Sequence, residues 1–228
     1  MNALAQKQAV LAALGNAGQM VSPQDLSPSI LRRDSAALGT QGEIPFYFQA
    51  NNSTGGTPSA TSILLENNDS FIVTDIALLI KKCANTDAGH AAAISYNHYS
   101  NLVFTQNNDG NLQAIYNGEL TIEIDKRQFL PSLAASVFER IPDTQAGTTT
   151  TAYVNASTAN ATTVIARDSK NHALYGFFPV SPFVLTGNMT SQNIKIQLPA
   201  SLNLAATSDA NFATLVFNGY LVANNTIK

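Results

Sequence analysis

Cysteine is almost missing from this chain of 228 residues: Cys83 is the single one. One cysteine excludes an internal disulfide framework, and its neighbours do not have the spacing of a metal-binding motif. We therefore expect Cys83 to be a small buried apolar residue.

Charge is also scarce, since only 12% of the residues are charged and the net charge is −3. The basic pairs Arg32-Arg33, Lys81-Lys82 and Lys126-Arg127 are too short for strong patches, so no global field for nucleic acid is expected. A weakly charged surface costs little free energy to desolvate against a neighbour. The composition therefore favours a protein whose surface meets other proteins, and an ordinary extracellular β protein is the equally compatible alternative.

Long apolar runs are absent, and none approaches the roughly 18–20 residues that span a bilayer. The N-terminus lacks a basic region followed by an apolar one, so we expect no Sec export. The sequence thus predicts neither a membrane span nor a secretory leader.

Catalytic motifs are missing as well, because neither a GxxxxGK loop nor a GxSxG elbow occurs. We interpret His90 and His98 as surface or hydrogen-bonded loop histidines rather than as metal ligands or catalytic groups. The carboxylates of Glu119, Glu123 and Asp125 could do acid–base chemistry, but a solvated strand face is the preferred interpretation. We predict a protein that is not an enzyme and has no metal or cofactor.

Short strands are what the sequence does contain, from Ile44 onward. Phe71–Lys81 and Leu215–Val222 are apolar on both faces, as central strands are; Gly219 marks a bulge there, or else a hairpin turn with Asn218. Asp109-Gly110 and Asn117-Gly118 predict hairpins between neighbouring short strands, the second of them joining Leu112–Tyr116 to Glu119–Ile124. About eight to ten strands without interleaved helices predict an all-β fold, a jelly-roll-type β-sandwich over residues 44–228.

The uncharged segment from Tyr175 to Gly187 is cut by Pro179 and Pro182. Proline cannot sit in a central ladder, so this segment must turn or run along an edge. Its aromatic side chains must be buried somewhere. We prefer burial at a corner of the sandwich, where they would close one end of the core; the alternative is burial against a neighbouring subunit. The aromatic residues concerned are Tyr175, Phe177, Phe178 and Phe183.

Residues 1–43 differ from the rest and predict an extended, partly helical arm. Ala3–Leu14 has helical spacing and Gly15 ends it, while a second short helix is expected over Pro28–Leu38. The arm has too few large apolar residues to close its own core. We therefore predict that it orders on a neighbouring subunit and is needed for assembly but not for folding. The candidate interface residues are Leu4, Leu11, Leu14, Ile30 and Leu31, together with Phe177, Phe178 and Phe183.

Four segments carry a resemblance to a known class: Asn67–Ile76, Tyr116–Ile124, Pro182–Asn188 and Ile194–Pro199. Together with the arm, they resemble structural proteins of bacterial virus particles, most of all jelly-roll capsid or capsid-associated proteins of small or tailless phages. The resemblance covers residues 44–228 and implies self-assembly without catalysis in a virion assembled in the host cytoplasm. The implied partners are copies of the chain and other virion proteins.

The arm differs in charge from a basic, genome-binding arm, because its three basic residues are balanced by three acidic ones. We therefore expect no specific nucleic-acid binding, and contact with an internal membrane stays open. The alternative function is a receptor- or glycan-binding β-sandwich of a tail, spike or surface appendage. Its candidate contact residues are Tyr96, Tyr99, Tyr153 and Tyr175.

Overall fold

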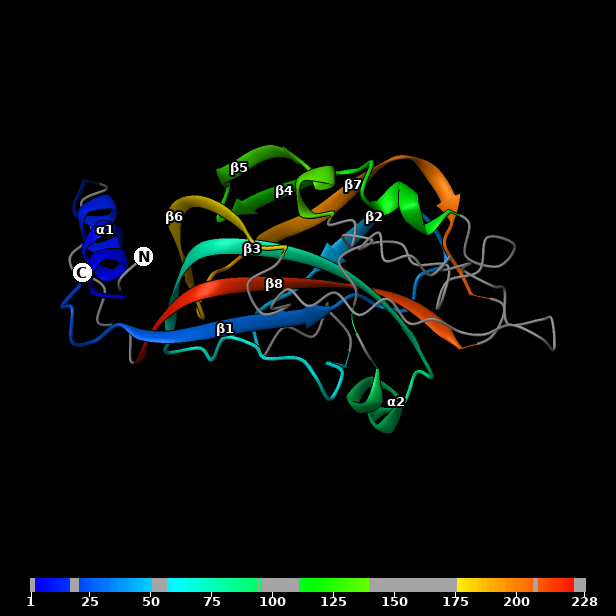
Figure 1. Ribbon diagram of the computed structural model, residues 1–228, viewed down its shortest axis with the longest axis horizontal. Coiled ribbons are helices and arrows are strands. Elements are labelled where there is room, and N and C mark those ends of the chain that lie inside the picture. The colour runs from blue at the N-terminus through cyan, green and yellow to red at the C-terminus, as the bar shows by residue number, and fades with distance from the viewer. Residues whose placement is uncertain are drawn as a thin grey trace, which may run out of the picture.

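Two four-stranded antiparallel sheets pack face to face in the computed structural model, which describes residues 3–16, 21–50, 57–93, 95, 111–139, 176–206 and 209–223 (Figure 1). The predicted all-β sandwich is therefore confirmed. The elements are α1 (Ala3–Asn16), β1 (Ser27–Asp34), β2 (Thr40–Phe46), β3 (Ser70–Cys83), α2 (Asp87–Ala92), the 3₁₀ helix η2 (Leu112–Ile115), β4 (Glu119–Ile124), β5 (Arg127–Ala134), the 3₁₀ helix η3 (Ala135–Phe138), β6 (Phe178–Thr186), β7 (Gln192–Asn203) and β8 (Ala210–Val222).

Strand pairing is nested along the chain. β1 pairs with β8, β2 with β7, β3 with β6, and β4 with β5. The pairings β3–β8 and β4–β7 then join these pairs into sheets of order β1-β8-β3-β6 and β2-β7-β4-β5. The chain consequently changes sheet at every connection except β4–β5 and resembles one long hairpin folded over on itself.

The core lies between the two sheets and is filled by the inward side chains of both. Phe217 of β8 stacks on Phe48 with ring centroids 4.4 Å apart and meets Phe183 of β6 edge-on at 6.3 Å. The predicted central strands Phe71–Lys81 and Leu215–Val222 are confirmed, because β3 and β8 each have a hydrogen-bonded neighbour on both sides. These two strands therefore form the middle of their sheet.

Gly219 lies at a close approach between these strands. β8 runs straight through Asn218 and Gly219, so the alternative hairpin there is wrong. The register shift lies on the opposite strand, between Val73 and Asp75 of β3. A Cβ on Gly219 would lie 1.8 Å from the carbonyl oxygen of Ile72, so only glycine fits this contact.

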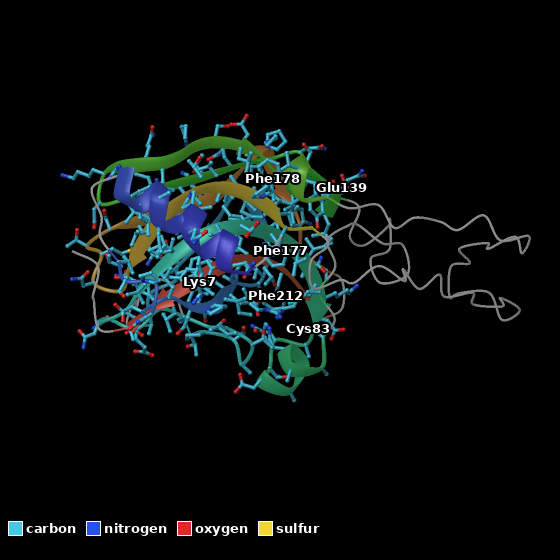
Figure 2. The ribbon with its side chains drawn as sticks, turned by 60° about the vertical axis from the view of Figure 1, so that its left-hand side comes forward. Lys7, Cys83, Glu139, Phe177, Phe178 and Phe212 are labelled. Atoms are coloured by element: carbon cyan, nitrogen blue, oxygen red, sulfur yellow. The ribbon has the colours of Figure 1, made fainter. Side chains whose placement is uncertain are left out.

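The proline-cut segment forms β6 at the edge of its sheet, as predicted. The β3–β6 register shifts between Pro179 and Phe183, where the missing proline N–H disturbs no regular ladder. Phe183 is buried in the core and Phe178 packs edge-on against Phe138, whereas Phe177, just before the strand, is half-buried (Figure 2). Phe183 and Phe178 are therefore covered by other parts of the same chain. Tyr175 lies outside the described residues.

The N-terminal region is part of the sandwich from Ser27 onward. A helix forms over the predicted Ala3–Leu14 and extends to Asn16 as α1. The helix predicted over Pro28–Leu38 is wrong, because this stretch pairs with β8 as the edge strand β1 and an edge strand tolerates Pro28. β2 begins at Thr40, so both sheets already include residues that the predicted division at residue 43 assigned to an arm.

The predicted hairpin at Asn117-Gly118 is also wrong, because the expected strand before it is the 3₁₀ helix η2. The hairpin found in this region joins β4 to β5 through Asp125 and Lys126, whose φ angles are 48° and 65°. Two successive positive φ angles are typical of a type I′ turn, which usually selects Asn or Gly. The other predicted turn, Asp109-Gly110, lies outside the described residues.

We expect Leu215→Asp and Val73→Asp each to prevent folding. Both side chains are buried in the core, where an unpaired carboxylate would lose its hydration. Circular dichroism and thermal melting test this, with the exposed Ser201→Asp of β7 as the control. A variant with unchanged melting would place its strand at the surface.

Gly219→Ala should lower the free energy of unfolding by at least about 2 kcal/mol, because the new Cβ collides with backbone rather than with a flexible side chain. Gly39→Ala is the matched control, since a Cβ there meets nothing within 4 Å. Urea unfolding of both variants gives the comparison. Equal effects would show that the β3–β8 approach is not as close as described.

Candidate functional site

A buried carboxylate, Asp34 at the end of β1, is the centre of a polar cluster on the outer face of the sheet β1-β8-β3-β6. It is only 4% exposed. Lys81 Nζ lies 2.5 Å from its Oδ2, and Thr214 Oγ1 donates to its Oδ1 at 2.6 Å. The hydroxyls of Ser59 and Thr61 also donate to Oδ2, the latter at 2.9 Å. Four groups from three other parts of the chain therefore meet at this carboxylate.

Strand register places these groups together. Asp34 of β1 lies opposite Thr214 of β8, and β8 in turn pairs with β3, where Lys81 lies opposite Phe212. Side chains alternate between the two faces of a strand, so these residues point away from the core that their neighbours fill. The neighbours Ala213 and Ile80 belong to that core.

Two short segments cover this face. Residues 57–63 are tied to β1 by a reciprocal backbone pair, in which Arg32 N–H donates to the Ile63 oxygen at 2.9 Å and Ile63 N–H donates back at 2.8 Å. The second cover is the six-residue helix α2. It begins after Thr86, whose hydroxyl accepts a hydrogen bond from Gly89 N–H. The polar cluster thus lies between the sheet and its covers.

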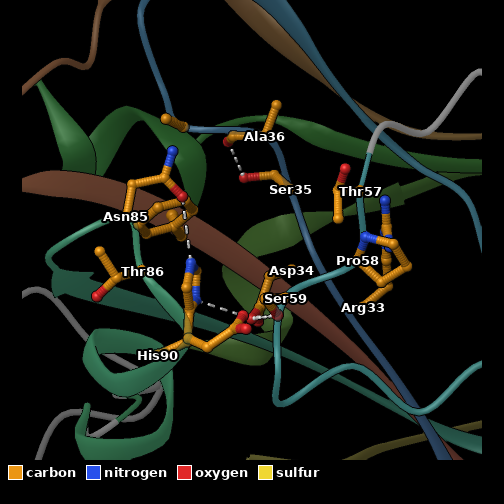
Figure 3. A pocket seen from close by; sticks show the side chains of 13 residues that line it. Arg33, Asp34, Ser35, Ala36, Thr57, Pro58, Ser59, Asn85, Thr86 and His90 are labelled. Carbon is orange, nitrogen blue, oxygen red and sulfur yellow. Dashed lines mark hydrogen bonds and ion pairs between the residues drawn. The ribbon is translucent and has the colours of Figure 1, made fainter.

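His90 is the residue through which α2 reaches the cluster (Figure 3). Its side chain is buried, and its Nδ1 lies 3.4 Å from Asp34 Oδ2. Its Nε2 lies 3.4 Å from Asn85 Oδ1, and its ring packs edge-on against Phe212 with centroids 4.6 Å apart. A pocket of about 380 Å³ adjoins this histidine and is lined by Asp34, Ser59, Thr57, Asp87 and Arg33 among others.

The electrostatics of the cluster favour an ionised Asp34. Burial by itself would raise the pKa of Asp34, but hydrogen bonds from Lys81, Ser59 and Thr214 and the charge of Lys81 hold that pKa well below its ordinary 3.8. The cluster therefore contributes stability above pH 3.8, and that stability is lost as the pH falls further. Burial also lowers the pKa of His90 below 6.5, the nearby Lys81 charge adds to this, and Asp34 opposes it in part.

This arrangement holds segments together rather than activating a nucleophile. A nucleophilic serine needs a base that accepts its proton, but Ser59 donates to a carboxylate that already pairs with Lys81. In the part of the chain that the structure describes, no group of three His, Cys, Asp or Glu side chains could hold a metal ion. No helix among the described residues is long and apolar enough to cross a membrane.

The predicted interface residues are spread over the molecule. Leu31 lies in the main core, and Leu14 belongs to a separate apolar cluster in which α1 packs on the outer face of the sheet, with Leu11 against it. These three therefore contact the chain itself, whereas Ile30 of β1 is 41% exposed. The side chain of Leu4 lies outside the described residues.

The local sequence pattern does not predict the Asp34 cluster. It predicts Lys81 as half of a short basic pair and His90 as a surface or hydrogen-bonded loop histidine, whereas the first is fully buried and the second is a buried residue of α2. One signal was present: a lysine within a strand that is apolar on both faces needs a buried partner. Cys83 is buried as predicted.

Comparisons with protein-family models, with curated proteins and with solved structures found no match.

Asp34→Asn or Lys81→Met alone should lower the free energy of unfolding by about 3–5 kcal/mol, because each leaves its partner buried without an opposite charge. The double variant should lose less than the sum of the two single variants, and a urea-unfolding cycle measures the difference.

The control is the exposed pair Glu43–Lys195, whose N–O distance is 2.6 Å. Glu43→Gln should change the unfolding free energy by less than about 1 kcal/mol. If both pairs behave alike, the Asp34 pair is as solvated as the surface pair.

Proposed function

We propose that this chain is a virion structural protein that self-assembles into a viral shell and acts without catalysis, and that its sandwich is a jelly roll. The observation that carries the proposal is the nested strand pairing, first with last and inward to β4–β5. Eight strands in two four-stranded sheets, linked by chain crossings between them, support this proposal, because a jelly roll is a double sheet of eight strands. That architecture recurs in viral capsid domains.

Surface composition supports the same proposal. Only 12% of the chain is charged, so subunit contacts would desolvate few ions for each unit of area buried. A shell is built from many copies of the same contact, so a modest free energy at each contact is multiplied. The proposed partners are copies of this chain and other virion proteins.

A candidate contact surface lies at the edge strand β1. Ile30 and Ile63 are 41% and 43% exposed, a high value for large apolar side chains. Ile63 pairs with Arg32, two residues along the strand from Ile30, so the two isoleucines lie close together at this edge. An edge strand with exposed apolar side chains is suited to contact with another chain.

Sedimentation of the purified chain over increasing concentration, followed by electron microscopy, tests the proposal. We expect closed particles or large rings of uniform size, because identical contacts close by symmetry. A species that stays monomeric or trimeric and binds glycans on an array would contradict the proposal and favour the appendage alternative, since jelly rolls also form lectin domains.

Ile30→Asp should reduce assembly while leaving circular dichroism and melting unchanged, because this side chain is exposed in the single chain. Gln128→Asp on the edge strand β5 of the other sheet adds the same charge at an exposed position and is the control. If only Gln128→Asp blocks assembly, the contact surface is not the β1 edge.

A further inference from the structure

The short helix α2 packs on the outer face of the sheet, and one buried histidine, His90, makes its contacts there. It has six residues, and its local hydrogen bonds include His90 N–H to Thr86 O at 2.9 Å and Ala93 N–H to Gly89 O at 3.1 Å. Its His90 ring lies between Phe212 of β8 and the carboxylate of Asp34. Such a short element can open locally while the two sheets stay folded.

We propose that α2 and His90 form an acid-sensitive latch, which is closed at neutral pH and opens in mildly acidic solution to uncover the outer face of the sheet around Phe212 and Asp34. The opened face includes the Asp34 cluster and the adjoining pocket. The proposal is independent of shell assembly.

The charges around His90 explain why a proton on it would be poorly accommodated. Asp34 is the nearest negative group, but it is paired more closely with Lys81, at 2.5 Å against 3.4 Å for the histidine. Arg32 Nε lies on the other side of the same carboxylate, 3.9 Å from Oδ1. A protonated His90 would therefore join a carboxylate already shared by two cations, at a buried position.

The remaining neighbours do not reverse this balance. The α2 helix itself contributes Asp87, whose charge favours a protonated His90 but has the smallest of the influences on it. From β8 the facing residues are the uncharged Phe212 and Thr214, and the 57–63 segment faces the cluster with the hydroxyls of Ser59 and Thr61. Arg33 also lines the pocket and is buried.

The direction of the pH effect follows from linkage. Burial and the Lys81 charge lower the pKa of His90 in the closed state below 6.5, the value to which it returns when the ring is exposed. The open state therefore binds more protons, and the closed state loses stability as the pH falls below 6.5. Asp34 acts in a separate range, because its contribution is lost only below 3.8.

Hydrogen exchange of the full-length protein between about pH 7.5 and pH 5 tests the latch through the amides of His90 and Ala93. Their protection factors should fall below pH 6.5, by at most about tenfold per pH unit for one proton. Amides of the central β3–β8 ladder should keep their protection over this range.

Two non-titrating variants isolate the histidine. His90→Gln keeps a polar contact for Asn85, and His90→Phe keeps the ring contact with Phe212; both should make the α2 protection factors independent of pH in this range. His172→Gln is the matched control and should keep the pH dependence of the unmodified protein.

Three outcomes would overturn the proposal. The first is constant protection in the unmodified protein, and the second is a pH dependence that survives in the variants. The third is an NMR titration of the unmodified protein in which the His90 ring has a pKa at or above 6.5, because acid would then stabilise the closed latch. This last measurement needs no variant and decides the question even if substitution at His90 disturbs folding.

Discussion

The antiparallel pairing of β3 with β8 is the contact on which the other parts of the molecule depend. It runs from Ser70 opposite Val222 to Cys83 opposite Ala210, and β1 and β6 add to its two sides. Because side chains alternate along a strand, one ladder has two different faces. The inward face forms the core with the second sheet, and the outward face needs covers of its own.

Those covers differ in chemistry at the two ends of the ladder. Near Ile72 and Tyr220 the outer face is apolar, and α1 closes it with Leu14. Near Lys81 and Cys83 it is polar, and α2 and residues 57–63 close it around Asp34. Cys83 lies close to Phe212 at this end, as Figure 2 shows. The apolar end is closed mainly by aliphatic contacts, whereas the polar end is built around the ionisable Asp34, Lys81 and His90.

Prolines within strands follow the sheet edges. Pro28 lies in β1, Pro45 in β2, Pro131 in β5, and Pro179 and Pro182 in β6, and all four strands are edges. The remaining case is Pro199 of the central strand β7, which lies in the stretch where the β2–β7 register shifts. Proline lacks the N–H that an interior ladder uses, so the strand prolines indicate the sheet boundaries.

The sequence by itself determined the features that depend on local pattern: the two-faced central strands, the edge position of the proline-cut segment and the helix near the N-terminus. Periodicity and proline chemistry act over a few neighbouring residues, so they can be read without the fold. Tertiary structure alone decided that Ser27–Asp34 is a strand, because its partner β8 lies far along the chain. The same holds for Asp125, whose unusual turn conformation is supported by hydrogen bonds from the backbone of Thr190 and Ser191. Tertiary structure also decided that Lys81, Asp34 and His90 meet, since a buried charge is tolerated only where distant residues supply its partner.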